Sequence, residues 1–169
     1  MVPDFVDFPD AAYRVLPPGI HRATVTEIEQ VFVDAFPNST RRRKLFEGWK
    51  SFRYLVRSQV PIVHERLDGS FVTDHVDPKD VDVAYYVDFE TFNRLPRDSQ
   101  AALRELWKLP KNVYYCDAYI IFVGVPARHP QAAQFDQTRD TIEKYWETCR
   151  DLQWAPLEGS MKGYIEVQP

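Results

Sequence analysis

The stretch that decides the fold is RLDGSFVTDHVDPKDVDVAYYVDF, residues 66–89. It runs through a Gly-Ser pair, crosses a short polar loop and reaches Asp80 and Asp82, which flank a single valine. The residues that follow alternate and are rich in β-branched and aromatic types, which predicts a strand. Side chains at positions i and i+2 of a strand point to the same face, so we expect both carboxylates to project together. The chain therefore places two like charges side by side at the entrance to a hydrophobic core.

Such a pair of carboxylates calls for a positive charge, because each otherwise raises the pKa of the other. Mg²⁺ or Mn²⁺ suits this role, since hard divalent cations bind carboxylate oxygens and keep water on their remaining positions. Just before the pair, Gly69 permits a tight backbone turn, and Ser70 can direct its hydroxyl and amide at an anion. Alone, Asp-Gly-Ser is a common turn and Asp-x-Asp is often a solvated strand edge. Together, they favour a site for a nucleoside triphosphate and its metal.

Helix and strand patterns flank this stretch on both sides and predict an α/β or α+β domain with a small mixed sheet and flanking helices. Thr24 and Glu27 have the spacing of a capping box at a helix start. The predicted helices are 24–36, 38–59, 96–109 and 131–153, and the predicted strands are 61–67, 80–89, 112–124 and 162–168, the last as a closing edge strand. Residues 1–20 are proline-rich and are interpreted as an irregular arm of a single domain, 1–169.

The helix predicted over residues 38–59 has two distinct faces. Its apolar stripe consists of Leu45, Trp49, Phe52 and Val56, and its basic stripe of Arg43, Lys50 and Arg57. The RRRK run at 41–44 is typical of a solvated helix end. If the basic stripe faced the candidate site, it could hold a triphosphate or an RNA backbone.

Composition narrows the class of protein. The chain has 169 residues, is 44% hydrophobic and carries a formal net charge of −4, which favours a folded domain and argues against a protein that coats nucleic acid. Cys116 and Cys149 have neither metal-ligand spacing nor a disulfide pattern, so we expect reduced core residues. We find no pattern of a signal peptide and no apolar run long enough for a membrane span, and we expect a cytoplasmic protein without a membrane partner.

The order of the motifs resembles that of the nucleotidyltransferase superfamily, which includes DNA polymerase beta, the aminoglycoside nucleotidyltransferases and the minimal nucleotidyltransferases of HEPN-partner toxin–antitoxin pairs. Here Gly69-Ser70 is followed by nine residues and then by Asp80-Val81-Asp82. The loop is one residue shorter than is usual in the minimal enzymes. The family adds a third carboxylate on a later strand, and Asp117 matches it. The resemblance covers residues 60–125, and the wider chain looks like an uncharacterised nucleotidyltransferase-like family of bacteria and phages.

This resemblance implies a fold, a reaction and roles for the motif residues. Asp80, Asp82 and Asp117 would hold two Mg²⁺ or Mn²⁺ ions, and Gly69 and Ser70 would bind the phosphates of a nucleoside triphosphate, with ATP favoured. A nucleoside monophosphate, most simply AMP, would pass to a hydroxyl of a protein or RNA in a toxin–antitoxin or phage-defence setting. A partner protein or a second copy of the chain would complete the substrate site, because no second helical domain is evident.

Alternatives remain open from the sequence alone. The chain could be a binding protein that keeps the fold without turnover, such as an antitoxin or regulator. It could also be an RNA-binding accessory domain that uses the basic helix. Asp117 could pair with an arginine, Arg66 or Arg97, in place of a metal ion.

Overall fold

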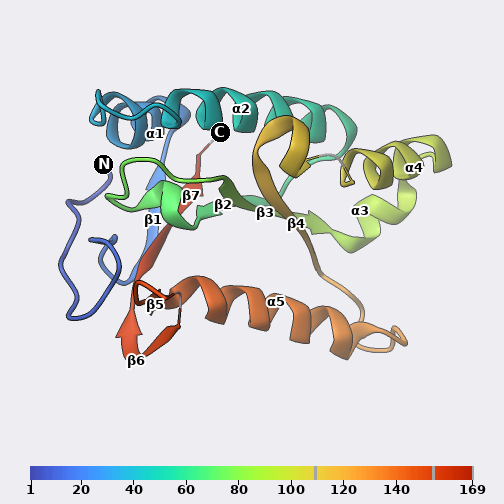
Figure 1. Cartoon of the computed structure of the whole chain (residues 1–169). Coiled ribbons are helices and arrows are strands. Elements are labelled where there is room, and N and C mark those ends of the chain that lie inside the picture. Colours follow the sequence, from blue (N-terminus) through green and yellow to red (C-terminus); the bar gives the residue numbers. More distant parts are fainter. Residues whose placement is uncertain (109, 154, 169) are drawn as a thin grey trace.

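A five-stranded mixed sheet forms the centre of the molecule, with helices on both of its faces (Figure 1). The computed structural model describes residues 1–108, 110–153 and 155–168. In spatial order the strands are β1 (Gly19–Ala23), β7 (Gly163–Val167), β2 (His64–Asp68), β3 (Val81–Asp88) and β4 (Cys116–Val123). The pairs β1–β7 and β3–β4 are parallel, and the pairs β7–β2 and β2–β3 are antiparallel. The predicted α+β class with a small mixed sheet is confirmed.

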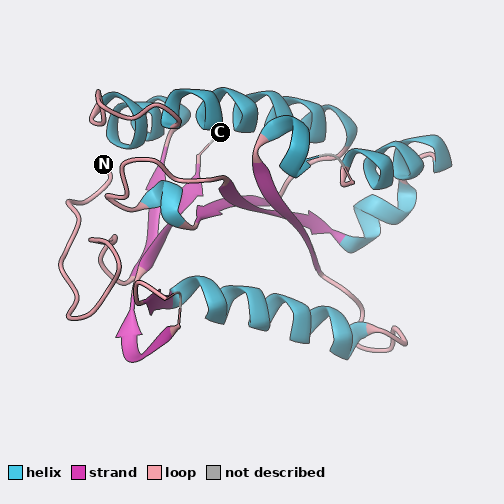
Figure 2. Cartoon of the chain, in the orientation of Figure 1, coloured by secondary structure: helices cyan, strands magenta, loops and turns pink. Residues whose placement is uncertain are grey.

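Helices and turns connect these strands (Figure 2). They are α1 (Val25–Glu29), the π-helical turn η1 (Gln30–Asp34), α2 (Arg42–Gln59), the 3-10 turn η2 (Ser70–Val72), α3 (Phe89–Arg94), α4 (Arg97–Leu106), the π-helical turn η3 (Pro110–Tyr114) and α5 (Ala132–Glu147). A second, two-stranded sheet pairs β5 (Thr148–Arg150) with β6 (Pro156–Met161). α2 covers one face of the large sheet and α5 the other (Figure 1). The predicted capping box of Thr24 and Glu27 is present at the start of α1.

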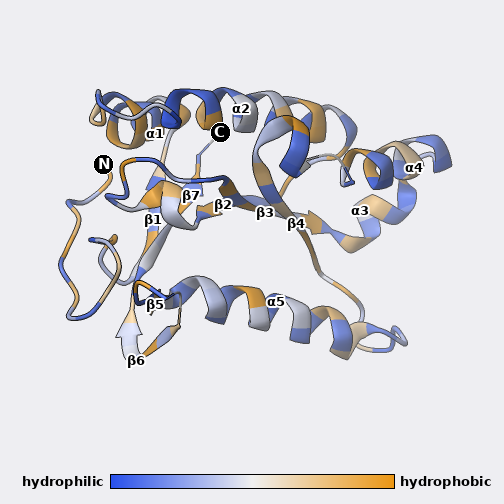
Figure 3. Ribbon diagram, in the orientation of Figure 1, coloured by the Kyte–Doolittle hydropathy of each residue, from blue (hydrophilic) through white to orange (hydrophobic). Residues whose placement is uncertain are grey.

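Alternation along β3 produces two apolar layers, one on each face of the sheet. Val83 and Tyr85 are buried in the larger layer beneath α2, whereas Ala84 and Tyr86 are buried in the smaller layer beneath α5. Figure 3 shows apolar residues along β3 and β4, between the two helices. The predicted apolar stripe of α2 is confirmed, because each member is at most 1% exposed: Leu45, Trp49, Phe52 and Val56. At about 1.5–3 kcal/mol for each buried apolar side chain, this stripe holds α2 on the sheet.

The basic residues of α2 are engaged within the fold. The predicted basic stripe pairs with acids of the same chain: Arg43 with Glu29 and Asp34, Lys50 with Glu47, and Arg57 with Glu65. The RRRK run is not simply a solvated helix end, because Arg42 is fully buried. Its guanidinium donates hydrogen bonds to backbone carbonyls from Phe32 and from residues 71, 73 and 75. Burial lowers the pKa of Arg42 to about 10, so it stays charged at neutral pH.

The order of the strands corrects the prediction for the C-terminal strand. β7 is an interior strand and not the predicted closing edge, because β1 pairs with its outer side and β2 with its inner side. β1 includes residues 19 and 20, which we expected to belong to the irregular arm. β1 lies exposed at the edge of the sheet, so its hydrophobic pattern in the sequence is weak. Its pairing with β7 identifies it as a strand.

Two further elements begin or end elsewhere than predicted. The residues expected to start a strand at 112 form η3, and Tyr115, with a φ of 58°, separates this turn from β4. The helix expected to reach residue 153 ends at Glu147, because Thr148 adopts an extended backbone and pairs with β6. The other predicted elements are present with shifted ends: 24–36 as α1 and η1, 38–59 as α2, 61–67 as β2, 80–89 as β3, and 96–109 as α4. The last residue predicted for that final helix, Leu109, lies outside the described residues.

Two further predictions concern the state of the cysteines and the presence of membrane-spanning helices. Cys116 and Cys149 are buried free thiols, as predicted. No helix in the described ranges combines the length and the apolar character needed to cross a bilayer.

Candidate active site

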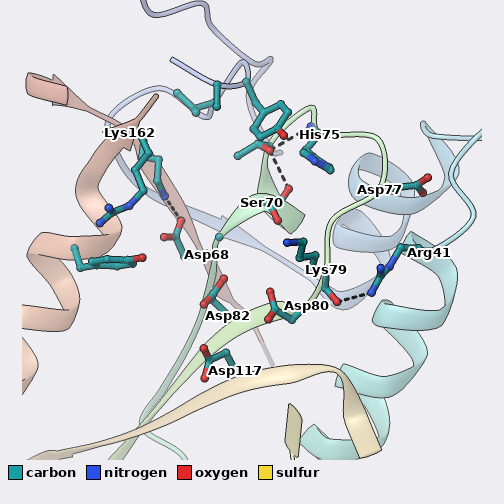
Figure 4. Close-up of a pocket in the computed structure, with 17 residues that line it drawn as sticks. Arg41, Asp68, Ser70, His75, Asp77, Lys79, Asp80, Asp82, Asp117 and Lys162 are labelled. Atoms are coloured by element: carbon teal, nitrogen blue, oxygen red, sulfur yellow. Dashed lines mark hydrogen bonds and ion pairs between the residues drawn. The ribbon is translucent and has the colours of Figure 1, made fainter. Parts of the chain in front are cut away.

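A cavity of about 590 Å³ opens where the ends of β2, β3 and β4 meet the η2 turn (Figure 4). Its acidic floor faces Arg41 and Lys79 on one side and Lys162 on the other (Figure 4). The structure brings all of the predicted site residues to this one cavity: Gly69, Ser70, Asp80, Asp82 and Asp117. The cavity is therefore the candidate active site.

Three of the carboxylates form a row across adjacent strands, which we call the acid row: Asp68, Asp82 and Asp117. Asp82 is in register with Asp68 of β2 on one side and with Asp117 of β4 on the other. Neighbouring strands lie about 4.8 Å apart, so the like charges are close. Asp80 lines the same cavity just before β3 begins, in agreement with the same-face placement predicted for it and Asp82.

Two lysines neutralise part of this negative charge. Lys162, which directly precedes β7, forms an ion pair with Asp68, and both side chains are largely buried. Lys111 of η3 approaches from the other end of the row, and its Nζ lies 3.2 Å from Oδ2 of Asp80 and 3.2 Å from Oδ2 of Asp117. The hydrogen bonds to Asp117 and Asp80 raise the pKa of Lys111, so its side chain is a cation and cannot act as a base.

Asp82 lies in the middle of the row and forms no ion pair with any described residue. Burial, followed by the charges of Asp68, Asp80 and Asp117, raises the pKa of Asp82 to about 7. The side chain of Asp117, by contrast, is 38% exposed. Burial raises the pKa of Asp68 as well, but Asp68 is paired with Lys162, so Asp82 is the acid that most needs a counter-charge.

Gly69 allows the backbone to approach the acid row closely. Its φ of 76° lies in the left-handed region, and a Cβ at this position would collide with the carboxylate of Asp82. The glycine is thus required by its contact with Asp82 as well as by the turn. Substituting Gly69 to test phosphate binding would also disturb the acid row.

The turn that contains Ser70 is held from below by a buried arginine. The carbonyl of Ser70 accepts a hydrogen bond of 2.8 Å from Thr73 Oγ1. The guanidinium of Arg42 donates to the carbonyls of Phe71 and Thr73, at 2.7 Å each. Because these bonds fix the turn through its backbone, the hydroxyl of Ser70 is left to line the cavity.

Basic and aromatic groups form the two sides of the cavity. On one side Arg41 donates a hydrogen bond of 2.9 Å to the carbonyl of Lys79, which places both side chains near Asp80 (Figure 4). Elsewhere on the wall, the guanidinium of Arg150 lies 3.7 Å from the centre of the Tyr145 ring. The cavity thus offers positive charge and a planar surface beside its acids.

Sequence reasoning missed Asp68, Lys111 and Lys162. Asp68 stands immediately before Gly69 in the motif, so a signal for it was present. Lys162 is 94 residues from its partner Asp68, and no local pattern marks it. Lys111, and neither of the two arginines that we considered, is the partner of Asp117. One of them, Arg66, pairs with acids elsewhere, namely Glu143 and Glu166.

The donor set suits a hard divalent cation, although it does not yet surround one. Asp80, Asp82 and Asp117 offer the carboxylate oxygens that Mg²⁺ and Mn²⁺ prefer, and Asp82 lacks an ion-pair partner among the described residues. Within the described ranges, no three His, Cys, Asp or Glu side chains are already placed around a common metal position. The ammonium of Lys111 stands between two of these donors. The residues therefore fit the metal by their chemistry.

Comparison with known proteins gives a family but no activity. A family described as being of unknown function, DUF6932, matches residues 6–168. No curated protein and no solved structure matches the chain.

Proposed function

The chain belongs to this family of unknown function, DUF6932, and from the residues of its cavity we propose that it is a metal-dependent nucleotidyltransferase. The enzyme would transfer a nucleoside monophosphate, with ATP as the favoured donor, to a hydroxyl group of a protein or an RNA. By analogy with minimal nucleotidyltransferases, this reaction would belong to a toxin–antitoxin or phage-defence setting, and the expected cytoplasmic location is compatible with such a role.

One observation carries the proposal: the Gly69-Ser70 turn and three carboxylates, located in or next to the parallel strands β3 and β4, line the same cavity. Asp117 is far enough from Asp80 and Asp82 in sequence that only the fold brings it to them. A set of acids with too little positive charge is costly for a folded protein unless it binds a cation. Its position beside an anion-binding turn supports a metal–triphosphate complex as the ligand.

The proposed reaction is an in-line displacement at the α-phosphorus. The oxygen of the acceptor hydroxyl forms a bond to this phosphorus, and the bond from phosphorus to the α,β-bridging oxygen breaks. Pyrophosphate leaves with the electron pair, and the hydroxyl proton passes to Asp117 and then to water. Bound Mg²⁺ or Mn²⁺ supplies positive charge to the attacking and leaving oxygens.

The other residues of the cavity have roles set by their charge. Ser70 would donate a hydrogen bond to the phosphates, and the backbone next to Gly69 would allow their close approach. Arg41 and Lys79 would neutralise the pyrophosphate as negative charge gathers on it. Asp80 and Asp82 would hold the metal that accompanies the triphosphate, and Asp117 would help to hold a second ion.

One observation favours a second function, a binding protein without turnover. Lys111 already bridges Asp80 and Asp117, and a permanent ammonium there would replace one metal ion. Such a protein would keep the cavity and bind a nucleotide or a partner, as an antitoxin or regulator would.

The test uses purified protein, Mg²⁺ and each α-³²P-labelled nucleoside triphosphate in a lysate of the host cells. We expect label on one protein or RNA band with the parent. With Asp117→Asn we expect that label to fall at least about 100-fold, because this residue takes the hydroxyl proton. The affinity for the nucleotide, measured by calorimetry, should change less than about threefold, because Asp80 and Asp82 remain.

The matched control is Asp140→Asn, an exposed acid on α5 whose loss should leave the label unchanged. Nucleotide binding without label from any donor would support the binding protein instead. Loss of label together with a lower melting temperature in Asp117→Asn would indicate a structural role for that carboxylate.

A further inference from the structure

Lys111 occupies a position that is otherwise suited to a metal ion. Its Nζ lies equally far, 3.2 Å, from one oxygen of Asp80, which precedes β3, and one oxygen of Asp117, which belongs to β4. An ammonium at this point neutralises both carboxylates at once. A divalent cation bridging the same two oxygens would need the same space.

The two carboxylates need a cation there because of their neighbour. Asp82 lies two residues after Asp80 and in register with Asp117, so three negative charges converge on one point of the sheet. Without Lys111, nothing among the described ion pairs would offset Asp80 and Asp117. The lysine therefore stabilises the free site in place of a metal ion.

The backbone that carries Lys111 is fixed, whereas its side chain can move. The η3 turn packs closely against α2, because a Cβ on Gly48 would collide with the carbonyl of Tyr114. The Tyr114 ring also packs against Phe52 at a tilt, with the ring centres 5.4 Å apart. The Lys111 side chain, in contrast, is 61% exposed. Moving it into solvent requires only rotations about its own bonds.

The strength of the contacts is small enough for displacement. Ion pairs of an exposed lysine each change an equilibrium constant by less than about tenfold, because water screens them. A divalent cation carries twice the charge and binds carboxylate oxygens directly. It can therefore replace the ammonium at moderate concentration, while a monovalent cation cannot.

We propose that Lys111 is a built-in cation of the site, which holds the position between Asp80 and Asp117 in the free protein and leaves it when a divalent cation binds there. This inference rests on the proposed function. It adds that Lys111 competes with metal for this position in the free protein, so that the site is completed only when a divalent cation displaces the lysine.

The test measures Mn²⁺ binding to the nucleotide-free protein by electron paramagnetic resonance of the unbound ion. Lys111→Met keeps the alkyl chain and removes the charge, and we expect it to bind Mn²⁺ about tenfold more tightly than the parent, because the competing cation is gone. Lys111→Arg keeps the charge and should bind as the parent does. Adding Asp117→Asn to Lys111→Met should abolish the gain, which locates the ion.

Two matched controls separate direct competition from a general charge effect. Lys108→Met removes a lysine that pairs with Glu105 on the same segment and should leave binding unchanged. Lys79→Met removes a charge from the same cavity and should raise the affinity less than Lys111→Met does. Equal affinities for Lys111→Met and the parent, or for Lys111→Met and Lys79→Met, would overturn the inference.

The outcome also distinguishes this inference from the proposed function. If neither the parent nor Lys111→Met binds Mn²⁺ at millimolar concentration, both the inference and the proposed function are wrong. If Mn²⁺ binding follows the expected pattern while no labelled nucleotide is transferred, Lys111 is a built-in cation of a site that does not catalyse transfer. If transfer is observed and Mn²⁺ binding is indifferent to Lys111, only the inference is wrong.

Discussion

Asp82 shows how a single residue of the site weakens the fold. Burial and the surrounding carboxylates raise its pKa from 3.8 to about 7. Between about pH 4 and pH 7, the folded protein therefore holds a proton at Asp82 that the unfolded chain has lost. Folding stability falls as the pH rises through this window, because the folded state binds more protons. Above pH 7, the folded state bears the whole cost of burying the charge.

We predict that Asp82→Asn raises the free energy of unfolding by about 2–4 kcal/mol at pH 8 in the absence of metal. At pH 4 the same substitution should have little effect, because Asp82 is then protonated in the folded protein. Urea denaturation in a chelating buffer at both pH values measures the difference. Asp117→Asn is the control and should not stabilise the protein, because Lys111 already neutralises that carboxylate. An equal gain at both pH values would mean that the charge of Asp82 is not the cause.

Among the elements, β7 contributes most to the continuity of the sheet. It pairs with β1 on one side and with β2 on the other, so it joins the start of the fold to the strand that precedes the Gly-Ser turn. Ile165 of β7 is fully buried in the layer beneath α2, whereas Ile20 of the edge strand β1 is 47% exposed. The same residue type therefore has different surroundings on two neighbouring strands.

We predict that Ile165→Ala lowers the free energy of unfolding by about 2–5 kcal/mol, because it leaves a cavity in an interior strand. Ile20→Ala is the matched control and should cost less than about 1 kcal/mol, because half of the side chain already contacts water. Thermal and urea denaturation of both variants provide the comparison. Equal costs would contradict the interior position of β7.

Helices and strands with a clear local pattern could be predicted from the sequence, whereas the long-range pairing of strands could not. α2 and β3 follow from their sequences, because one face of each is apolar and the period of the pattern identifies the element. The interior position of β7 depends on β1, whose residues lie at the other end of the sequence. The candidate site divides in the same way. Its acids lie in recognisable strand motifs, whereas Lys111 and Lys162 reach them only through the tertiary structure.

At the scale of the whole molecule, the acid row is tied to the C-terminal part of the sequence. Lys162, which directly precedes β7, is paired with Asp68, and the two side chains are only 10% and 3% exposed. Burial raises the pKa of Asp68, and the ammonium of Lys162 acts in the opposite direction. Removing one partner would leave a buried charge without compensation, and this is more costly than removing both.

We predict that Lys162→Met destabilises the protein by about 3–5 kcal/mol at pH 8. The double variant Lys162→Met/Asp68→Asn should recover most of this loss, because no uncompensated charge remains. A double-mutant cycle by urea denaturation should give a coupling free energy above about 2 kcal/mol. Lys50→Met, which removes an exposed pair with Glu47, is the control and should cost less than about 0.5 kcal/mol. Additive losses in the cycle would show that the pair is not coupled.

The interior position of β7 also affects how the chain folds while it is being made. The ribosome releases β2, β3 and β4 well before β7, so these strands can pair while one side of β2 still has unbonded amides and carbonyls. A bare strand edge can recruit the same edge of another nascent copy, and long-range pairing closes slowly. Aggregation during rapid synthesis is therefore the hazard of this topology, and it ends when the final strand fills the gap between β2 and β1.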